Sequence, residues 1–147
     1  MTIRTVPTNA FKTRIFNSSI ALDLINAPMK FALFNSNADL VETTATYTEQ
    51  MANEVTSPRR AYPVGGNSIP VGNLVRSIDF SIASPNTLQF KIDIPVWSNV
   101  EFTTSGGMLY FDNASKDSIA CYSFGGPVTV YGDFLITIPT GGSIVSI

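Results

Sequence analysis

Two neighbouring runs of alternating residues, between positions 73 and 94, restrict the fold of this chain more than any other feature of its sequence. Side chains of a β-strand point to opposite faces with a period of two, so each run predicts a strand with one apolar and one polar face. Ser84, Pro85 and Asn86 lie between the runs and predict a turn. We therefore expect a hairpin, closed at one end by the only tryptophan, Trp97, around which the rest of the chain is organised. Its apolar positions are Leu74, Ile78, Phe80 and Ile82 in the first strand and Leu88, Phe90, Ile92 and Ile94 in the second.

The rest of the chain is punctuated by glycine, asparagine and proline at short intervals. Short, evenly spaced strands of this kind are typical of a β-sandwich or barrel. We expect an all-β fold, a single antiparallel β-sandwich or barrel, over residues 20–147. Residues 20–25 fit a strand or one helical turn, because periodicity cannot decide so short a run. The other expected strands are 29–35, 100–104, 108–112, 119–124, 128–131, 134–139 and 143–147, with turns at 35–39, 105–107, 113–115, 125–127 and 132–133.

One short helix is expected near residues 47–53. Thr46 and Glu49 have the spacing of a capping box, in which the hydroxyl and the carboxylate accept hydrogen bonds from backbone N–H groups of the first turn. Residues 56–72 contain repeated prolines and glycines, and proline cannot donate to a strand ladder. Residues 56–72 are therefore expected to form a loop with at most an edge strand near residues 67–71.

The N-terminus, residues 1–19, is expected to be an extended arm outside the core. It is locally basic, with no acidic residue before Asp23. A frayed, solvated terminus and an arm that orders on a neighbouring subunit or partner both fit, and three large apolar residues favour the arm. In the loop at 56–72, Arg59 and Arg60 are expected to face solvent or a partner. The expected partner-interface residues are Arg4, Phe11, Lys12, Arg14, Phe16, Arg59 and Arg60, with Ile15 as a further apolar residue of the arm.

Composition narrows the possible functions. A length of 147 residues suits one domain, and a net charge of −2 argues against nucleic acid as partner, since phosphate contacts need clustered lysine and arginine. There is no histidine, which removes the commonest general base and metal ligand. The single cysteine, Cys121, cannot form an internal disulfide and is expected to be a small buried hydrophobe. Neither a membrane span nor a secretory signal is recognisable, so we expect no membrane partner. We also expect no cofactor.

Some carboxylates and aromatic residues invite a chemical interpretation. Asp79 and Asp93 fall in neighbouring expected strands, but both occupy polar positions where an exposed carboxylate is ordinary. Asp112, Asp117 and Asp133 lie near loop ends but lack the alternation of a calcium loop. We therefore expect no catalytic residue, no metal site and no enzyme. The last third of the chain is rich in aromatic residues: Tyr110, Phe111, Tyr122, Phe124, Tyr131 and Phe134. We expect most of them in the core and the remainder at subunit contacts.

Several short motifs follow one another in a characteristic order along the chain. They are Lys30-Phe31-Ala32-Leu33-Phe34-Asn35-Ser36, Asn53-Glu54-Val55, Ala61-Tyr62-Pro63-Val64-Gly65-Gly66, Pro95-Val96-Trp97-Ser98, residues 108–112, Tyr122-Ser123-Phe124-Gly125 and Gly132-Asp133-Phe134-Leu135-Ile136. From about residue 20 to the C-terminus, their order and spacing resemble the small β-rich virion proteins encoded among the structural genes of tailed bacteriophages. Ser57-Pro58-Arg59-Arg60 departs from that pattern, where relatives often have small, glycine-rich residues.

The resemblance implies a structural component of a virion, without enzymatic activity. Some relatives resemble capsid decoration (cement) proteins that sit as trimers on the outside of the head, and others are structural proteins of unknown role. The resemblance therefore implies a homo-oligomer, with a trimer favoured, that binds the major capsid protein or another virion protein and is made in the bacterial host cytoplasm. Two other functions stay open. A head or tail fibre or receptor-binding module would expose aromatic and carboxylate side chains at one end of the sandwich. A small carbohydrate-active enzyme would place two carboxylates face to face in a groove.

Overall fold

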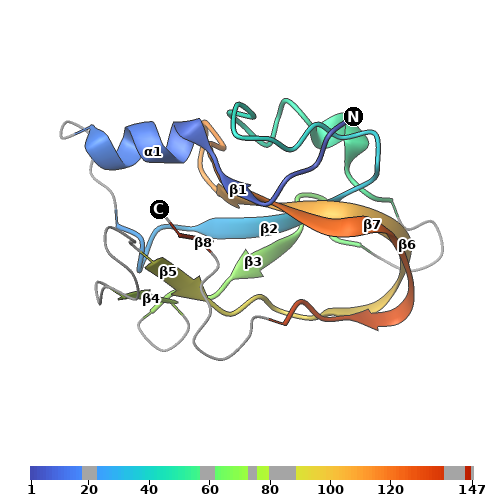
Figure 1. The fold of residues 1–147 in the computed structure, drawn as a ribbon. Coiled ribbons are helices and arrows are strands. Elements are labelled where there is room, and N and C mark those ends of the chain that lie inside the picture. The colour runs from blue at the N-terminus through green and yellow to red at the C-terminus, as the bar shows by residue number, and fades with distance from the viewer. Residues whose placement is uncertain (18–22, 57–61, 73–75, 80–88, 138–144, 147) are drawn as a thin grey trace.

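The computed structural model describes residues 1–17, 23–56, 62–72, 76–79, 89–137 and 145–146. One α-helix and eight strands form in these residues, and Figure 1 shows them as a two-layered β structure with the helix lying along one margin. The elements are β1 (Val6–Pro7), α1 (Asn9–Phe16), β2 (Met29–Phe34), the 3₁₀ turn Met51–Asn53, β3 (Asn67–Ile69), β4 (Arg76–Asp79), β5 (Gln89–Ile92), β6 (Trp97–Phe111), β7 (Ser118–Phe134) and β8 (Val145–Ser146). The prediction of an all-β, antiparallel sandwich-like fold is therefore confirmed.

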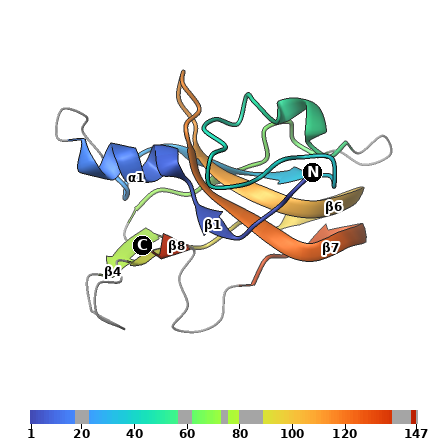
Figure 2. The same cartoon turned by 45° about the horizontal axis from the view of Figure 1, so that its top comes forward.

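The larger sheet has five strands in the order β1-β7-β6-β2-β3, and all its neighbouring pairs are antiparallel. β6 and β7 are by far its longest strands, with 15 and 17 residues, and they pair along most of their length. Figures 1 and 2 show that this two-stranded ribbon bends strongly. One half of the ribbon lies beside β2, and the other half curves away to form the opposite layer. The bent ribbon therefore organises the fold.

An irregularity in the ladder coincides with this bend. Between the pairs Thr104–Val128 and Gly106–Ser123, β6 contributes only Ser105, whereas β7 contributes residues 124–127. The surplus residues make the path along β7 longer, as in a β-bulge, and a bulged strand bends and twists. Gly125 and Gly126 supply this longer path with φ angles of +80° and +143°, which L side chains seldom adopt. The turns expected at residues 105–107 and 125–127 are thus wrong, because both segments continue their strands through the bend. The turn expected at 132–133 is wrong as well, because these residues lie within β7.

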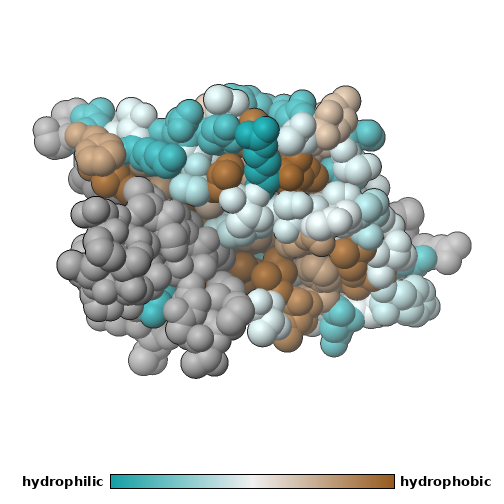
Figure 3. Space-filling view, in the orientation of Figure 1, coloured by the Kyte–Doolittle hydropathy of each residue, from teal (hydrophilic) through white to brown (hydrophobic). Residues whose placement is uncertain are grey.

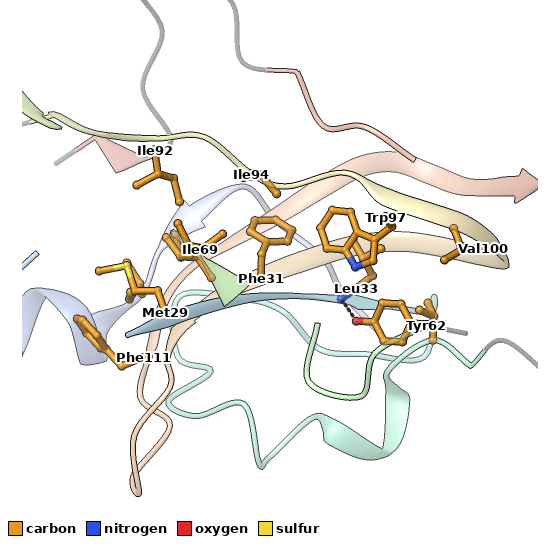
Figure 4. Close-up of a cluster of buried hydrophobic side chains, with 14 of the residues drawn as sticks. Met29, Phe31, Leu33, Tyr62, Ile69, Ile92, Ile94, Trp97, Val100 and Phe111 are labelled. Carbon is orange, nitrogen blue, oxygen red and sulfur yellow. Dashed lines mark hydrogen bonds between the residues drawn. The ribbon is translucent and has the colours of Figure 1, made fainter. Parts of the chain in front are cut away.

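The predicted hairpin exists as the pair β4 and β5, with Ile78 opposite Phe90. Together with β8 it forms a separate three-stranded sheet in the order β4-β5-β8. Ile92 and Ile94 point from this side into the core, as Figure 4 shows. The expectation that the hairpin organises the chain is wrong, because the β6–β7 ribbon has that place. The ends of the predicted strands at 73–75 and 80–88 lie outside the described residues.

The core lies on both faces of β2. On one face Met29, Phe31 and Leu33 pack with Trp97 in the larger hydrophobic cluster, drawn in Figure 4. Phe31 and Trp97 meet edge to face with ring centroids 6.0 Å apart. On the other face Ala32 and Phe34 are fully buried in a smaller cluster under residues 38–47. β2 therefore has the nearly continuous apolar sequence that is typical of a strand covered on both sides.

The helix expected near residues 47–53 does not form; the segment consists of turns that end in the 3₁₀ turn Met51–Asn53. Half of the capping box is present, because the Glu49 N–H donates to Thr46 Oγ1 at 3.3 Å, but the Glu49 carboxylate accepts from Ala45 instead. The backbone of Tyr47 is bound to Lys116 at 3.0 Å and its ring is buried. These tertiary contacts outweigh the local helical preference.

The extended N-terminal arm is also wrong for residues 1–17. β1 pairs with β7, Ile3 bridges to Leu40, and α1 lies against the sheet with Phe11 only 1% exposed. The other expectations fare better. The strand at 29–35, the edge strand near 67–71 and the turns at 35–39 and 113–115 are confirmed, as is the burial of Cys121. The expected element at 20–25 lies mostly outside the described residues, and no helix among those described is long and apolar enough to cross a membrane.

Candidate functional site

The helix α1 begins at a threonine cap that also attaches it to the sheet. Thr8 Oγ1 accepts from the Phe11 N–H at 3.3 Å, which satisfies one of the unpaired donors of the first turn. The same hydroxyl faces the carbonyl oxygens of Ser118 and Ile119, at 3.0 and 3.2 Å, and the Thr8 N–H donates to Ile119 at 2.9 Å. The start of α1 is therefore fixed against the first residues of β7.

The inner face of α1 is held by an aromatic contact and an ion pair. The Phe11 ring lies 6.4 Å from that of Phe111, and the Arg14 guanidinium lies over the same Phe111 ring at 4.7 Å. Arg14 Nη1 also meets Asp117 Oδ2 at 3.1 Å, and both side chains are mostly shielded from water. A cation over an aromatic ring and a shielded ion pair each favour one orientation of the helix. Phe11 and Arg14 are thus structural residues, and the prediction that they form a partner interface is wrong for Phe11, which solvent hardly reaches.

The outer face of α1 is open to solvent. Phe16 is 83% exposed, an unusual value for so large an apolar side chain. Lys12 lies one turn before it on the same side of the helix. A shallow depression of about 660 Å³ runs along this face, and the described residues that line it are Asn9, Lys12, Thr13, Phe16 and Asn17. Of the predicted interface residues, the structure leaves Lys12 and Phe16 on one accessible surface.

The remaining predicted interface residues do not join this face. Arg4 pairs with Glu42 at 3.1 Å, and both side chains are largely exposed. The pKa of Glu42 is lowered chiefly by a hydrogen bond that its carboxylate accepts from its own backbone N–H, and also by the positive charges of Arg4 and Lys12. Arg59 and Arg60 lie outside the described residues.

A second accessible surface, which the sequence did not indicate as a unit, lies on the distal half of β7 and the residues after it. Val128, Tyr131 and Leu135 are 38%, 71% and 59% exposed, and Asp133 is exposed between the last two. Phe124, Phe134 and Ile136 of the same stretch are partly buried and face the core, where the Phe134 ring contacts those of Trp97 and Phe102. Among the described residues, β7 pairs on the side away from β6 only with the two residues of β1. Figure 3 shows hydrophobic atoms gathered in the region between the two layers on this side of the molecule. We call the exposed residues Tyr131, Asp133 and Leu135, which alternate along this segment, the β7 surface.

A buried carboxylate surrounded by tyrosines is the most unusual chemical feature of the described residues. Glu54, only 8% exposed, accepts from the Gly65 N–H through Oε1 at 2.7 Å and from the Tyr47 hydroxyl through Oε2. The Tyr110 hydroxyl donates to the Gly65 carbonyl at 2.7 Å, and its ring stacks on Tyr47 with centroids 4.6 Å apart. Tyr62 belongs to the same group: its hydroxyl accepts from the Leu33 N–H at 2.8 Å, a bond drawn in Figure 4. We call Tyr47, Glu54, Tyr62, Gly65 and Tyr110 the tyrosine clasp.

Burial raises the pKa of each clasp tyrosine, and the Glu54 charge raises it further. These hydroxyls therefore stay protonated and serve as hydrogen-bonding groups. Both Glu54 oxygens have donors inside the clasp, which leaves this carboxylate with a structural role: it joins the loops before and after the 57–61 segment to β2 and β6. Gly66 fits this arrangement closely, since a Cβ there would lie 1.9 Å from the carbonyl oxygen of Phe31.

A buried arginine connects the two sheets. Arg76 on β4 is fully buried, and its guanidinium donates to backbone carbonyls of the turn before β2 and of β3. The acceptors are the oxygens of Ile25 and Ala27 and, at 2.8 Å, that of Ile69. Burial lowers the pKa of Arg76. The side chain therefore acts as a brace between the small sheet and the edge of the large one.

The strand register places Asp79 and Asp93 at opposite ends of the β4–β5 pair, and the other aspartates considered from the sequence have separate partners. Asp79 pairs with Gln89, whereas Asp93 follows Ile92, the partner of Arg76 at the opposite end of the β4–β5 pair. Among the residues that the structure describes, no group of three potential metal ligands occurs. Asp112 meets Lys30 and Lys116 at 3.8 and 3.7 Å. Asp117 pairs with Arg14, and Asp133 accepts from the Asn99 N–H at 3.0 Å.

Comparisons of this chain with protein families, with curated proteins and with solved structures find no match.

Proposed function

We propose that this chain is a structural protein of a tailed-phage virion, a capsid decoration protein that binds the outer head surface as an oligomer. One observation supports the proposal most directly. The motifs on which the resemblance rests lie far apart in the sequence, yet they meet in one contact network. Leu33 of the first motif binds Tyr62 of the third, and Glu54 of the second binds Gly65. The residues on which the resemblance rests thus hold the scaffold of this chain together, and this supports the proposal.

The geometry of α1 suits attachment to a shell. A cement protein must present contact groups in a fixed arrangement, because ordering a flexible segment costs free energy on binding. The cap at Thr8 and the Arg14–Asp117 pair fix the helix, while Lys12 and Phe16 face outward. A basic and an aromatic group on one helical turn fit an acidic surface with an apolar pocket on the major capsid protein. Attachment of this kind is expected to weaken as salt is added.

The location of the protein in a virion reconstruction is the direct test. A rebinding assay then identifies the contact: purified protein is added to heads from which it has been stripped, and bound copies are counted. Phe16→Ser and Lys12→Glu are expected to reduce rebinding, whereas Met51→Ser, which alters another exposed apolar residue, keeps it. Absence of the protein from purified virions would refute the proposal. Full rebinding by both α1 variants would refute the role of this helix.

A receptor-binding module is the second candidate, and one observation favours it. Tyr131, 71% exposed, lies directly opposite Glu101 on β6, and Asp133 follows two residues later on the same face of β7. An exposed aromatic ring beside carboxylates can stack on a sugar ring while the oxygens accept from its hydroxyl groups. Binding of the purified protein to host-surface glycans, lost in Tyr131→Ser, would establish this function in place of shell attachment. Equal binding by wild type and variant would exclude the Tyr131 platform.

A further inference from the structure

Two exposed surfaces of this chain are apolar and carry opposite charges. The outer face of α1 has Phe16 beside Lys12, along the depression described above. The β7 surface has Tyr131 and Leu135 on either side of Asp133. Exposed groups of large apolar side chains on one surface mark interaction sites more often than scattered single residues do. We therefore expect each surface to contact another molecule.

The two surfaces cannot cover each other within one molecule. α1 lies along one margin of the fold, whereas the distal half of β7 belongs to the layer beyond the bend (Figures 1 and 2). A symmetrical contact of each surface with itself would also bring like charges together, Lys12 against Lys12 or Asp133 against Asp133. Like charges at close range disfavour such a contact. A contact between unlike surfaces of two copies pairs the charges correctly.

We propose that the chain self-associates head to tail, the outer face of α1 of one copy docking on the β7 surface of the next. Phe16 then lies against Tyr131 and Leu135, and Lys12 approaches Asp133 between them. A head-to-tail contact uses two different surfaces, so it produces a closed ring when the rotation between copies closes and an open chain otherwise. Each copy offers one donor helix and one acceptor surface, whatever the number of copies.

The contact is small, which sets the expected strength. A helix of eight residues is only about 12 Å long, and contacts below about 1,200 Å² of total buried area are usually transient. We therefore expect reversible association that depends on concentration. A closed ring strengthens it, because each copy is then held at both of its surfaces.

Charge reversal with complementation tests the proposal. Sedimentation equilibrium of the wild type up to about 100 µM is expected to show a mass above that of one chain. Lys12→Glu alone and Asp133→Lys alone place like charges at every contact, and each is expected to weaken association about tenfold or more. An equimolar mixture of the two variants restores one native pair and one reversed pair, so it is expected to recover association.

Three further variants keep the test independent of folding. Asp133 accepts from the Asn99 N–H, so Asp133→Asn, which retains an acceptor oxygen, accompanies Asp133→Lys, and circular dichroism checks both folds. Phe16→Ser is expected to weaken association, whereas the matched control Met51→Ser leaves it unchanged. A wild-type chain that stays monomeric at about 100 µM overturns the inference. So does undiminished association of folded Phe16→Ser, or a mixture that associates no better than its components.

This assay uses purified protein without heads or glycans, so its outcome is separate from the proposed virion function. If the chain associates head to tail but is absent from virions, only the proposed function fails. If the chain is found on heads and remains monomeric in solution, only the inference fails.

Discussion

Replacing Glu54 with alanine removes the carboxylate at the centre of the tyrosine clasp. Two buried donors then lose their acceptor, the Gly65 N–H and the Tyr47 hydroxyl. Each unsatisfied buried group costs about 1–3 kcal/mol, and the vacated side-chain volume adds a packing loss. We therefore expect the free energy of unfolding to fall by about 3–5 kcal/mol. For a chain of this length that corresponds to roughly 3 °C of Tm for each kcal/mol.

Urea denaturation followed by circular dichroism measures this loss, with the slope of the free energy against urea as a check that the unfolding remains two-state. Glu54→Gln keeps an oxygen for the Gly65 N–H and replaces the other oxygen with an NH2 group, which can donate to the Tyr47 oxygen, so a smaller loss of about 1–2 kcal/mol is expected. Glu49→Ala is the matched control: this exposed carboxylate of the same loop accepts only the peripheral Ala45 N–H, and its removal is expected to cost no more than about 0.5 kcal/mol.

A loss below about 1 kcal/mol for Glu54→Ala would refute the reasoning, because the two donors would then have found other partners or water. The same holds if Glu54→Ala and Glu49→Ala are equally harmless. Coupling between Glu54 and Tyr47 can be measured separately with Tyr47→Phe in a double-mutant cycle, where direct contact predicts an interaction energy of about 0.5–3 kcal/mol.

Three other perturbations test the packing, the brace and the buried ionisable groups. Gly107→Ala places a Cβ 2.2 Å from Cε1 of Phe31, so thermal unfolding is expected to show a loss of about 1–3 kcal/mol from overpacking; an unchanged Tm would contradict the close contact. Arg76→Met leaves the three carbonyl acceptors of the brace without their donor, so the free energy of unfolding measured in urea is expected to fall by about 3–5 kcal/mol. Lys30→Met, at a part-exposed ion pair, is expected to lower it less, and equal losses would refute the brace. Burial raises the pKa of the Cys121 thiol from 9.0 to about 12 and raises the pKa of Tyr47, Tyr62, Tyr110 and Tyr122 above 10.0. Their protonated forms therefore stabilise the fold, and stability is expected to decrease as the pH rises above about 9–10. Tyrosinate absorbance from these four tyrosines should appear only with unfolding, and their gradual titration in folded protein would contradict the reasoning.

The regular strands of this fold were predictable because their sequences carry a direct signal. The β4–β5 hairpin follows from period-two alternation and a turn between its strands. β2 shows why a one-face interpretation was incomplete: Ala32 and Phe34 are also buried, under a loop whose position no local pattern reveals. Its almost uninterrupted apolar sequence was the available signal for a strand covered on both faces.

The bent ribbon could not be predicted, because glycine has two uses that look alike in a sequence. Gly106 and Gly107 were interpreted as a turn, yet they lie within β6. A Cβ at Gly106 would lie 2.4 Å from the Tyr122 carbonyl oxygen, and one at Gly107 would overlap the Phe31 ring. These glycines permit close approach of strands and side chains, a requirement set by residues more than a dozen positions away. The sequence alone does not distinguish that use from a turn.

The helix α1 was missed although its signals are present: Thr8 is a good N-cap, and Phe11 and Ile15 are spaced by one turn. Its charges were interpreted as those of a flexible arm. The clasp was missed for a different reason. Glu54 and Gly65 were noticed only as motif positions, and their direct contact depends on how two loops meet across the sheet.

The placement of α1 changes how its function can be tested. Residues that hold the helix and residues that face outward alternate along it, with Phe11 inside and Lys12 outside, then Arg14 inside and Phe16 outside. Removal of residues 1–19 would therefore take away part of the core together with the proposed contact surface, and loss of binding would not separate the two. Inner-face changes such as Arg14→Met are expected to lower stability, whereas outer-face changes such as Lys12→Glu should leave the unfolding midpoint nearly unchanged and alter association alone. If both kinds of change alter stability and association together, the division of α1 into a structural and a contact face is refuted.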